Sequence, residues 1–187
     1  MNLPGPQYLG YAYLISEVLL TVTRRSRGDG ARQDKSTLGM LWVVILLSVV
    51  AGVFVAARVS AGALPNPDLW RLLGLIVFVV GIAFRWWAIV VLGRFFTVDV
   101  QIARDHELVE RGPFRLVRHP SYTGVLLGFL GFGFSLANWI ALLVVMVPIF
   151  LALRRRMQVE EEALSAALGE KYFSYMQRTK RLLPGLY

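Results

Sequence analysis

The chain has 187 residues, of which 56% are hydrophobic and 17% are charged, and its mean hydropathy is +0.57. This composition is too apolar for a soluble domain of this size and predicts an all-α integral membrane protein. The net charge of +8 does not call for a nucleic-acid partner, because basic loops that flank hydrophobic segments account for it, and the lack of cysteine excludes a disulfide framework, a thiol nucleophile and a cysteine metal site.

Three apolar segments in the first half of the chain predict three transmembrane helices. They cover residues 8–23, with an extension upstream to Pro6, residues 38–57 and residues 69–93. About 20 apolar residues in helical form cross a bilayer, so the second segment is the clearest span. The first seven residues lack the basic region of a cleavable signal peptide, and we therefore expect the first helix to be retained.

The fourth apolar segment is too long for one crossing. A single helix over residues 121–153 would measure about 50 Å, against a hydrocarbon core of about 30 Å. The sequence therefore predicts a helical hairpin that turns near Ala137 and Asn138, which brings the number of transmembrane helices to five. Gly124, Gly128 and Gly131 form a stripe that would let the two helices of the hairpin approach closely. We expect one domain over residues 1–187, with N-terminal helices at 6–58 and a catalytic half at about 69–187.

Lys and Arg are unevenly distributed between the connecting segments. Five follow the first helix, five follow the third and seven lie in the tail from Arg154, whereas the opposite side has only Arg58 and Arg71. The positive-inside rule therefore predicts a multi-pass protein with its N-terminus outside and its C-terminus in the cytoplasm. The two longest polar stretches, residues 106–124 and 154–187, would then share the cytoplasmic face.

The first of these stretches contains both histidines and runs directly into an apolar helix. Pro120 suits the first turn of that helix, and His119, which precedes a proline, is expected at its mouth. Free backbone amides and the positive end of the helix dipole would meet Arg118 and His119 there, which favours an anion-binding site. A plain basic loop before a membrane helix explains the same residues equally well.

The second polar stretch predicts an amphipathic helix that continues from the membrane. One face of it collects Met157, Glu160, Leu164 and Leu168. Glu160 is thus a carboxylate on an apolar stripe, one turn after Arg156, and this position favours a functional role. For Glu161 and Glu162 we expect ordinary charges that solvate the helix.

Two further charges, Glu17 and Arg85, lie inside predicted spans, where burying a charge is costly. Their distances from the cytoplasmic ends of their helices place them at compatible depth. A structural ion pair between two helices is the favoured interpretation. Arg85 snorkelling to the interface, or receiving an anionic group of the substrate, is the alternative.

The motifs of the C-terminal half resemble the isoprenylcysteine carboxyl methyltransferase family. The resemblance rests on the order and spacing of His106-x-Leu108-Val109, Gly112-Pro113-Phe114, Arg118-His119-Pro120-Ser121-Tyr122-x-Gly124, Arg156-x-x-x-Glu160-Glu161, Leu164, Gly169, Tyr172 and Tyr175. It covers residues 86–184, and the small number of spans is similar to the compact prokaryotic branch. Phe114 stands where the family usually has tyrosine, and Thr179-Lys180 stands where Val-Pro is common.

The resemblance implies a membrane methyltransferase whose cofactor, S-adenosylmethionine, is held between the cytoplasmic connecting loop and the C-terminal helical tail. It implies a cofactor site lined by Gln101, His106, Glu107, Leu108, Val109, Phe114, His119, Pro120, Ser121, Tyr122 and Glu160. Arg156 would meet the acceptor as the catalytic and substrate-binding residue. The histidines and scattered acids give no convincing metal set, and the sequence has no Gly-rich dinucleotide fingerprint.

We therefore expect S-adenosylmethionine-dependent methylation of a lipophilic acceptor, a small molecule or a lipidated substrate, with a carboxylate oxygen as the methylated atom. Methyl transfer is an in-line displacement that needs positioning and exclusion of water rather than a metal or a protein nucleophile. Such an acceptor would enter laterally from the bilayer. Three alternatives stay open: a lipid methyltransferase acting on an amine or phenol, a nicotinamide-dependent membrane reductase of similar build, and a non-enzymatic membrane scaffold.

Overall fold

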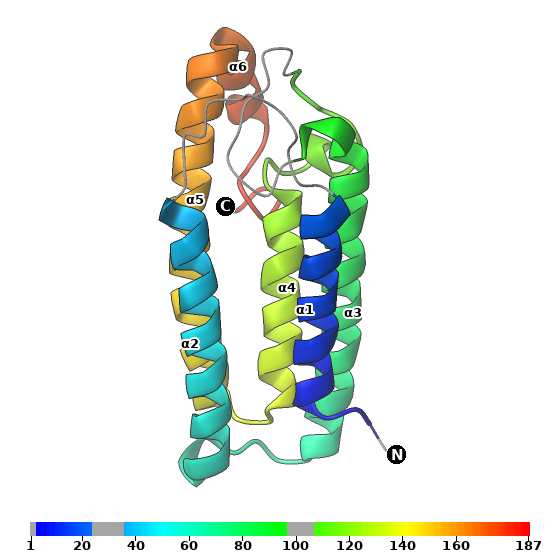
Figure 1. Ribbon diagram of the computed structural model, residues 1–187, viewed down its shortest axis with the longest axis vertical. Coiled ribbons are helices and arrows are strands. Elements are labelled where there is room, and N and C mark those ends of the chain that lie inside the picture. The colour runs from blue at the N-terminus through cyan, green and yellow to red at the C-terminus, as the bar shows by residue number, and fades with distance from the viewer. Residues whose placement is uncertain (1–2, 24–35, 97–106) are drawn as a thin grey trace.

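The computed structural model describes residues 3–23, 36–96 and 107–187. Five long helices stand side by side, and a short sixth folds back from the end of the fifth (Figure 1). Their bounds are α1 Pro6–Thr23, α2 Ser36–Arg58, α3 Pro67–Leu92, α4 Pro120–Ser135, α5 Trp139–Leu168 and α6 Glu170–Arg178. Short 3-10 turns at Ser60–Gly62, Gly93–Phe95 and Gly112–Arg115 lie in the connections. The predicted all-α architecture is confirmed, and the apolar segments predicted from the sequence are helical with ends that differ by a few residues.

The outer surface of the bundle is apolar. Large side chains that are more than half exposed lie along several helices, for example Leu46 and Leu47 on α2, Val79 on α3 and Leu151 on α5. Apolar surface of this extent is typical of contact with lipid rather than water. Two segments, Thr37–Arg58 and Pro67–Phe95, are long and apolar enough to cross a membrane. Five crossings remain a prediction.

The α4–α5 connection turns where the hydrophobic length predicts it. Ala137 adopts a left-handed conformation (φ 48°), and Asn138 caps α5, because its side chain accepts a hydrogen bond from the Ala141 amide at 3.0 Å. The same side chain donates to the Val59 carbonyl at 2.8 Å. The turn is therefore fixed to the end of α2.

The glycine stripe of α4 faces α3, and the prediction that it faces α5 was wrong. A Cβ atom on Gly124 would lie 2.7 Å from the Arg85 amide nitrogen and the Gly81 carbonyl, and one on Gly131 would collide with the backbone of Phe78 and Gly74. The stripe recurs every three or four residues and so marks one face of α4. The short turn to α5 leaves that face free to pack on α3, which is the helix in most extensive contact with α4.

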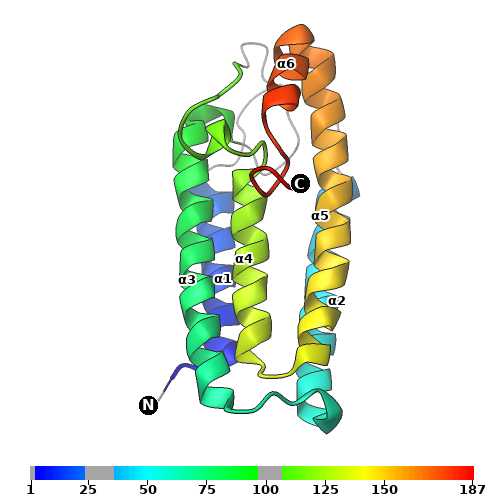
Figure 2. The same cartoon turned by 180° about the vertical axis from the view of Figure 1, so that it is seen from behind.

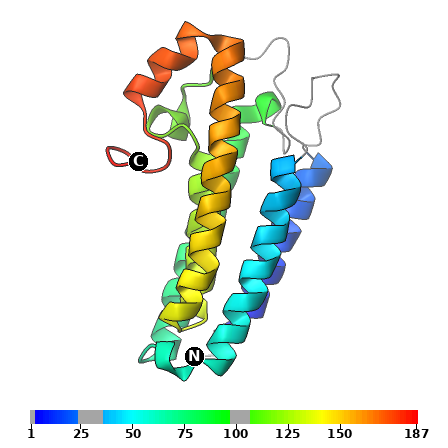
Figure 3. The ribbon, with the colours of Figure 1, turned by 90° about the vertical axis from the view of Figure 1, so that its left-hand side faces the viewer.

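The helices form two groups that meet at the α4–α5 hairpin. Figure 2 shows α1, α3 and α4 on one side and α2 with α5 on the other, and Figure 3 shows α2 and α5 side by side in front of the remaining helices. Val125, Phe129 and Phe132 of α4 pack with Val145 and Ile149 of α5 in the core. The upper part of α5 extends beyond the other helices and carries α6 to the end of the bundle where residues 107–119 lie (Figure 1). The two polar stretches therefore share one end, and the α2–α3 connection lies at the other.

Candidate active site

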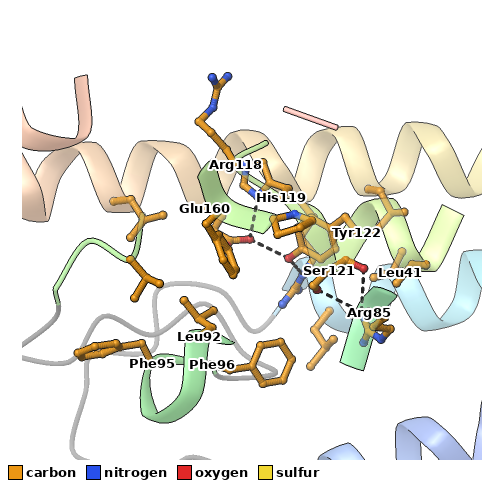
Figure 4. Close-up of a pocket in the computed structure, with 18 of the residues that line it drawn as sticks. Leu41, Arg85, Leu92, Phe95, Phe96, Arg118, His119, Ser121, Tyr122 and Glu160 are labelled. Carbon is orange, nitrogen blue, oxygen red and sulfur yellow. Dashed lines mark hydrogen bonds and ion pairs between the residues drawn. The ribbon is translucent and has the colours of Figure 1, made fainter. Parts of the chain in front are cut away.

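A cavity opens at the end of the bundle where α5, α6 and the segment before α4 converge (Figure 4). One part of its wall is polar and consists of Glu107, His119, Ser121, Tyr122, Arg156 and Glu160. The part nearer the middle of the bundle is mainly apolar and includes Leu38, Leu41, Trp42, Ile45, Val125 and Leu153, together with the charged residues Glu17 and Arg85. The cavity thus joins a polar region to an apolar one within a single space.

The mouth of α4 supplies the centre of the polar wall. Pro120 is the first residue of α4, and His119 occupies the N-cap position without a side-chain capping hydrogen bond, as predicted. The His119 carbonyl accepts the Tyr122 amide at 3.0 Å, so the first turn is closed by backbone alone. The His119 ring is consequently available to side chains of α5.

A chain of three side chains links Glu160 to Arg156. The Tyr122 hydroxyl donates to Glu160 Oε2 at 2.8 Å and accepts from Arg156 Nε at 3.0 Å. Arg156 Nη1 also donates to Thr37 Oγ1 of α2 at 3.4 Å. Arg156 is buried, whereas 30% of the Glu160 side chain is exposed. Glu160 therefore presents its carboxylate to the cavity, and Arg156 orients Tyr122 from behind it.

Glu161 does not solvate the helix; the expectation for this residue was wrong. It is 4% exposed and accepts hydrogen bonds from Arg118 Nε at 2.9 Å and from Arg181 Nη2 at 2.6 Å. His119 Nε2 lies 3.1 Å from its Oε1 atom. We call these four residues the Glu161 cluster. The anion that Arg118 and His119 meet at the helix mouth is thus the chain's own Glu161.

The segment 179–182, here called the C-terminal strap, lies along the residues before α4. The Arg118 and His119 amides donate to the carbonyls of Lys180 and Arg181 at 2.8 and 3.0 Å, and Thr123 Oγ1 donates to the Leu182 carbonyl at 2.9 Å. The backbone of the strap and the Arg181 side chain therefore bind the same short stretch. This arrangement fixes the α4 mouth to α5 and to the end of the chain.

Electrostatics keep the Glu161 carboxylate ionised. Burial of Glu161 would raise its pKa, but hydrogen bonds from His119, Arg181 and Arg118 outweigh burial and lower the pKa to about 2. The hydrogen bonds to Glu161 raise the pKa of Arg181 against a smaller effect of burial. Burial also raises the pKa of the Tyr172 and Tyr175 phenols, so both stay neutral. Tyr175 can therefore donate its hydroxyl hydrogen to the Phe114 carbonyl at 2.6 Å.

Glu17 and Arg85 form the predicted ion pair between α1 and α3. Arg85 Nε lies 2.9 Å from Glu17 Oε1, and Nη2 lies 3.0 Å from Oε2. Arg85 Nη1 also donates to Ser121 Oγ of α4 at 3.3 Å. The two residues are thus paired as expected, and because both line the cavity, a contact between Arg85 and an anionic group stays a prediction.

Most of the predicted site residues line this one cavity. They are Glu107, Leu108, Val109, Phe114, His119, Pro120, Ser121, Tyr122, Glu160, Arg156 and Arg85. Gln101 and His106 lie outside the described residues. Sequence reasoning missed Thr37, Glu161 and Arg181. Nothing local in the sequence marked Thr37 or indicated that Arg118 and Arg181 would bind Glu161.

Comparison with known proteins adds a family match. The model of the isoprenylcysteine carboxyl methyltransferase (ICMT) family matches residues 72–166. The protein-S-isoprenylcysteine O-methyltransferase B of Arabidopsis thaliana is 34% identical over 113 residues, which are 59% of this chain and 57% of that protein. The mouse protein-S-isoprenylcysteine O-methyltransferase is 33% identical over 59% of this chain and 40% of its own length. The chain thus spans about half the length of the curated relatives it matches.

A solved structure has the same helical arrangement. The eukaryotic intramembrane Ras methyltransferase ICMT superposes with a TM-score of 0.66 at 25% identity, covering 78% of this chain and 52% of that one.

Proposed function

Because the chain belongs to the isoprenylcysteine carboxyl methyltransferase family, whose model matches residues 72–166, we propose that it methylates a carboxylate of a lipophilic acceptor with S-adenosylmethionine as the donor. The observation that carries this proposal is the cavity itself. It places the partly exposed Glu160 carboxylate and the buried Arg156 guanidinium next to an apolar region between helices. A charged cofactor and a lipid-like acceptor need such neighbouring regions if they are to meet.

The polar wall fits the cofactor. Bound S-adenosylmethionine supplies an electrophilic methyl group on a positively charged sulfur, and it also carries an ammonium group. Glu160 faces the cavity with an oxygen hydrogen-bonded to Tyr122 and has room to accept further donors. The aromatic side chains of Phe114, Tyr122 and Tyr172 offer faces for a flat base. Glu160 would hold the cationic part.

The apolar wall fits the acceptor. Leu41, Trp42 and Val125 line the deeper part of the cavity, which lies between helices whose outer faces are apolar. Arg156 stands at the boundary between the two regions, next to Leu153 along α5. A planar guanidinium there would neutralise and orient a carboxylate through paired hydrogen bonds. An isoprenylated cysteine, the group in the relatives' names, would offer an apolar chain to the apolar wall and a carboxylate to Arg156.

The chain's residues have little chemistry of their own to perform. A carboxylate is already ionised at neutral pH, so the acceptor needs no general base. The helices exclude water from the deep end of the cavity, and the polar wall aligns the two partners, which are the effects that speed an in-line transfer.

The decisive experiment measures binding and product together. Purified protein is titrated with S-adenosylmethionine and with a reduced nicotinamide cofactor, then incubated with labelled methyl donor and an N-acylated S-farnesylcysteine. We expect saturable binding of S-adenosylmethionine alone and a labelled methyl ester. Binding of the nicotinamide cofactor, or label on an amine or phenol of a lipid extract, would refute carboxyl methylation.

Glu160→Gln should weaken S-adenosylmethionine binding about 10- to 150-fold, the effect of losing a hydrogen bond to a charged group. Glu162→Gln is the matched control, because Glu162 is an exposed glutamate two residues away. Its affinity should stay at the wild-type value in the same titration. Equal affinities in the two variants would remove Glu160 from the cofactor site.

We also propose that the cavity end of the bundle faces the cytoplasm and that the α2–α3 connection lies outside. The basic loops support this orientation. The chain has no cysteine, so single cysteines introduced as Asn66→Cys and Lys171→Cys, both at exposed positions, can be labelled with an impermeant reagent in sealed vesicles. We expect labelling from opposite sides. Labelling of both from one side would overturn this topology.

A further inference from the structure

His119 lies between two carboxylates with different surroundings. Its Nε2 atom is 3.1 Å from Glu161 Oε1, whereas Nδ1 is 3.9 Å from Glu160 Oε2. Glu160 and His119 line the cavity (Figure 4). Glu161 is buried and enclosed by the other residues of the cluster named above. The ring is 4% exposed and stacks on Tyr122, with centroids 5.5 Å apart and planes 21° apart. Its two edges therefore meet different environments.

The contact with Glu161 determines which ring nitrogen of His119 carries the hydrogen. Arg118 and Arg181 donate to Glu161, so this carboxylate is ionised and can only accept. His119 Nε2, at hydrogen-bonding distance, must then be the donor. Arg118 and Arg181 already supply two positive charges to the single negative charge of Glu161, so Glu161 needs only a hydrogen-bond donor, not a charge, from the ring. A neutral ring with hydrogen on Nε2 satisfies the contact with Glu161 and leaves Nδ1, without hydrogen, 3.9 Å from Glu160 Oε2, where both atoms are acceptors.

We propose that Glu161 is a positioning residue, which holds His119 in the neutral tautomer protonated on Nε2 and so presents Nδ1 to the cavity as a hydrogen-bond acceptor. Nδ1 and the Glu160 carboxylate then form a pair of acceptors on one wall. A ligand ammonium group matches this pair in both its hydrogens and its charge. The inference rests on the proposed function only in identifying that group as the amino group of S-adenosylmethionine.

The C-terminal strap also helps to position His119. Its backbone carbonyls accept hydrogen bonds from the amides of Arg118 and His119. Its Arg181 side chain donates hydrogen bonds to Glu161 through Nε and Nη2. The His119 ring is thus fixed by Glu161 of α5, and the strap holds both the His119 backbone and Glu161. Residues that are far from the cavity opening therefore determine what His119 offers to a ligand.

The tautomer can be observed directly in the whole protein without added ligand. Nitrogen NMR on a histidine-labelled sample near neutral pH separates protonated from unprotonated ring nitrogens. The chain has two histidines, so comparison with His106→Asn assigns the His119 signals. We expect Nε2 protonated and Nδ1 unprotonated. Hydrogen on Nδ1, or on both nitrogens, would overturn the proposal whether or not the protein methylates anything.

A variant tests the part played by Glu161. Glu161→Gln should allow the other tautomer to appear and should weaken S-adenosylmethionine binding about 10-fold. Glu161→Asp, which keeps the charged acceptor, should restore part of the wild-type spectrum. Glu162→Gln serves as control and should change neither the spectrum nor the affinity. A folded Glu161→Gln protein with the wild-type tautomer and affinity would refute the positioning role.

The two proposals fail in distinguishable ways. If Glu161→Gln does not fold, the wild-type spectrum alone decides the tautomer. If wild-type protein shows the expected tautomer but no affinity for S-adenosylmethionine, the proposed function fails and the assignment of His119 stands.

Discussion

Replacing Arg156 with alanine should lower the rate of carboxylate methylation about 10- to 150-fold, with a much smaller change in cofactor affinity. Arg156 is 3% exposed, and its orientation is fixed by the Tyr122 hydroxyl and Thr37 Oγ1. A carboxylate entering from the apolar region needs a counter-charge at this boundary. The change should therefore appear in kcat with the acceptor, whereas a separate titration should report a nearly normal Kd for S-adenosylmethionine.

Two companion variants sharpen this result. Arg155→Ala removes the same charge from an exposed position on the same helix and should keep nearly full activity. Arg156→Lys keeps the charge but loses the planar fork, so it should recover only part of the rate. Near-normal turnover in Arg156→Ala, or loss of cofactor affinity alone, would contradict the carboxylate role and favour an amine or phenol acceptor.

The helices could be predicted because their signals are local. Long apolar runs set the number of elements, the length of residues 121–153 required a turn, and Pro120 marked where α4 begins. Glu160 stood out because the helical period placed it on an apolar stripe. Each of these signals depends only on residues within a few turns of one another.

The errors concern partners that are distant in the sequence. Glu160 and Glu161 are adjacent carboxylates on one helix. Glu161 differs from its neighbour because Arg118 and Arg181, which are distant in the sequence, enclose it and stabilise its charge. The glycine stripe predicted close packing correctly but not that α3 would be the partner. Helix periodicity identifies a face of a helix, but it does not identify what packs against that face.

Glu161→Gln should reduce the free energy of unfolding by about 3 kcal/mol, since removing one partner of a buried ion pair leaves the other charge uncompensated. The cost of losing the partner charge would be larger for Arg118 than for Arg181, because 9% of the Arg118 side chain is exposed, against 23% for Arg181. For a chain of this size we expect the Tm of detergent-solubilised protein to fall by about 6–12 °C. Glu162→Gln, at an exposed position, should shift the unfolding free energy by no more than about 0.5 kcal/mol.

The same carboxylate predicts how the protein responds to acid. Hydrogen bonds hold the Glu161 pKa at about 2 in the folded protein, below its ordinary value of 4.5, so the unfolded chain takes up the proton first as the pH falls. The contribution of Glu161 to stability is therefore complete above pH 4.5 and is lost as the pH falls from 4.5 towards 2. The stability difference between wild type and Glu161→Gln, measured along a pH series, should be constant near neutrality and shrink through this range. A difference that stays constant down to the acid end would mean that folding does not lower the pKa of Glu161, so the hydrogen bonds of the Glu161 cluster would not favour its ionised form.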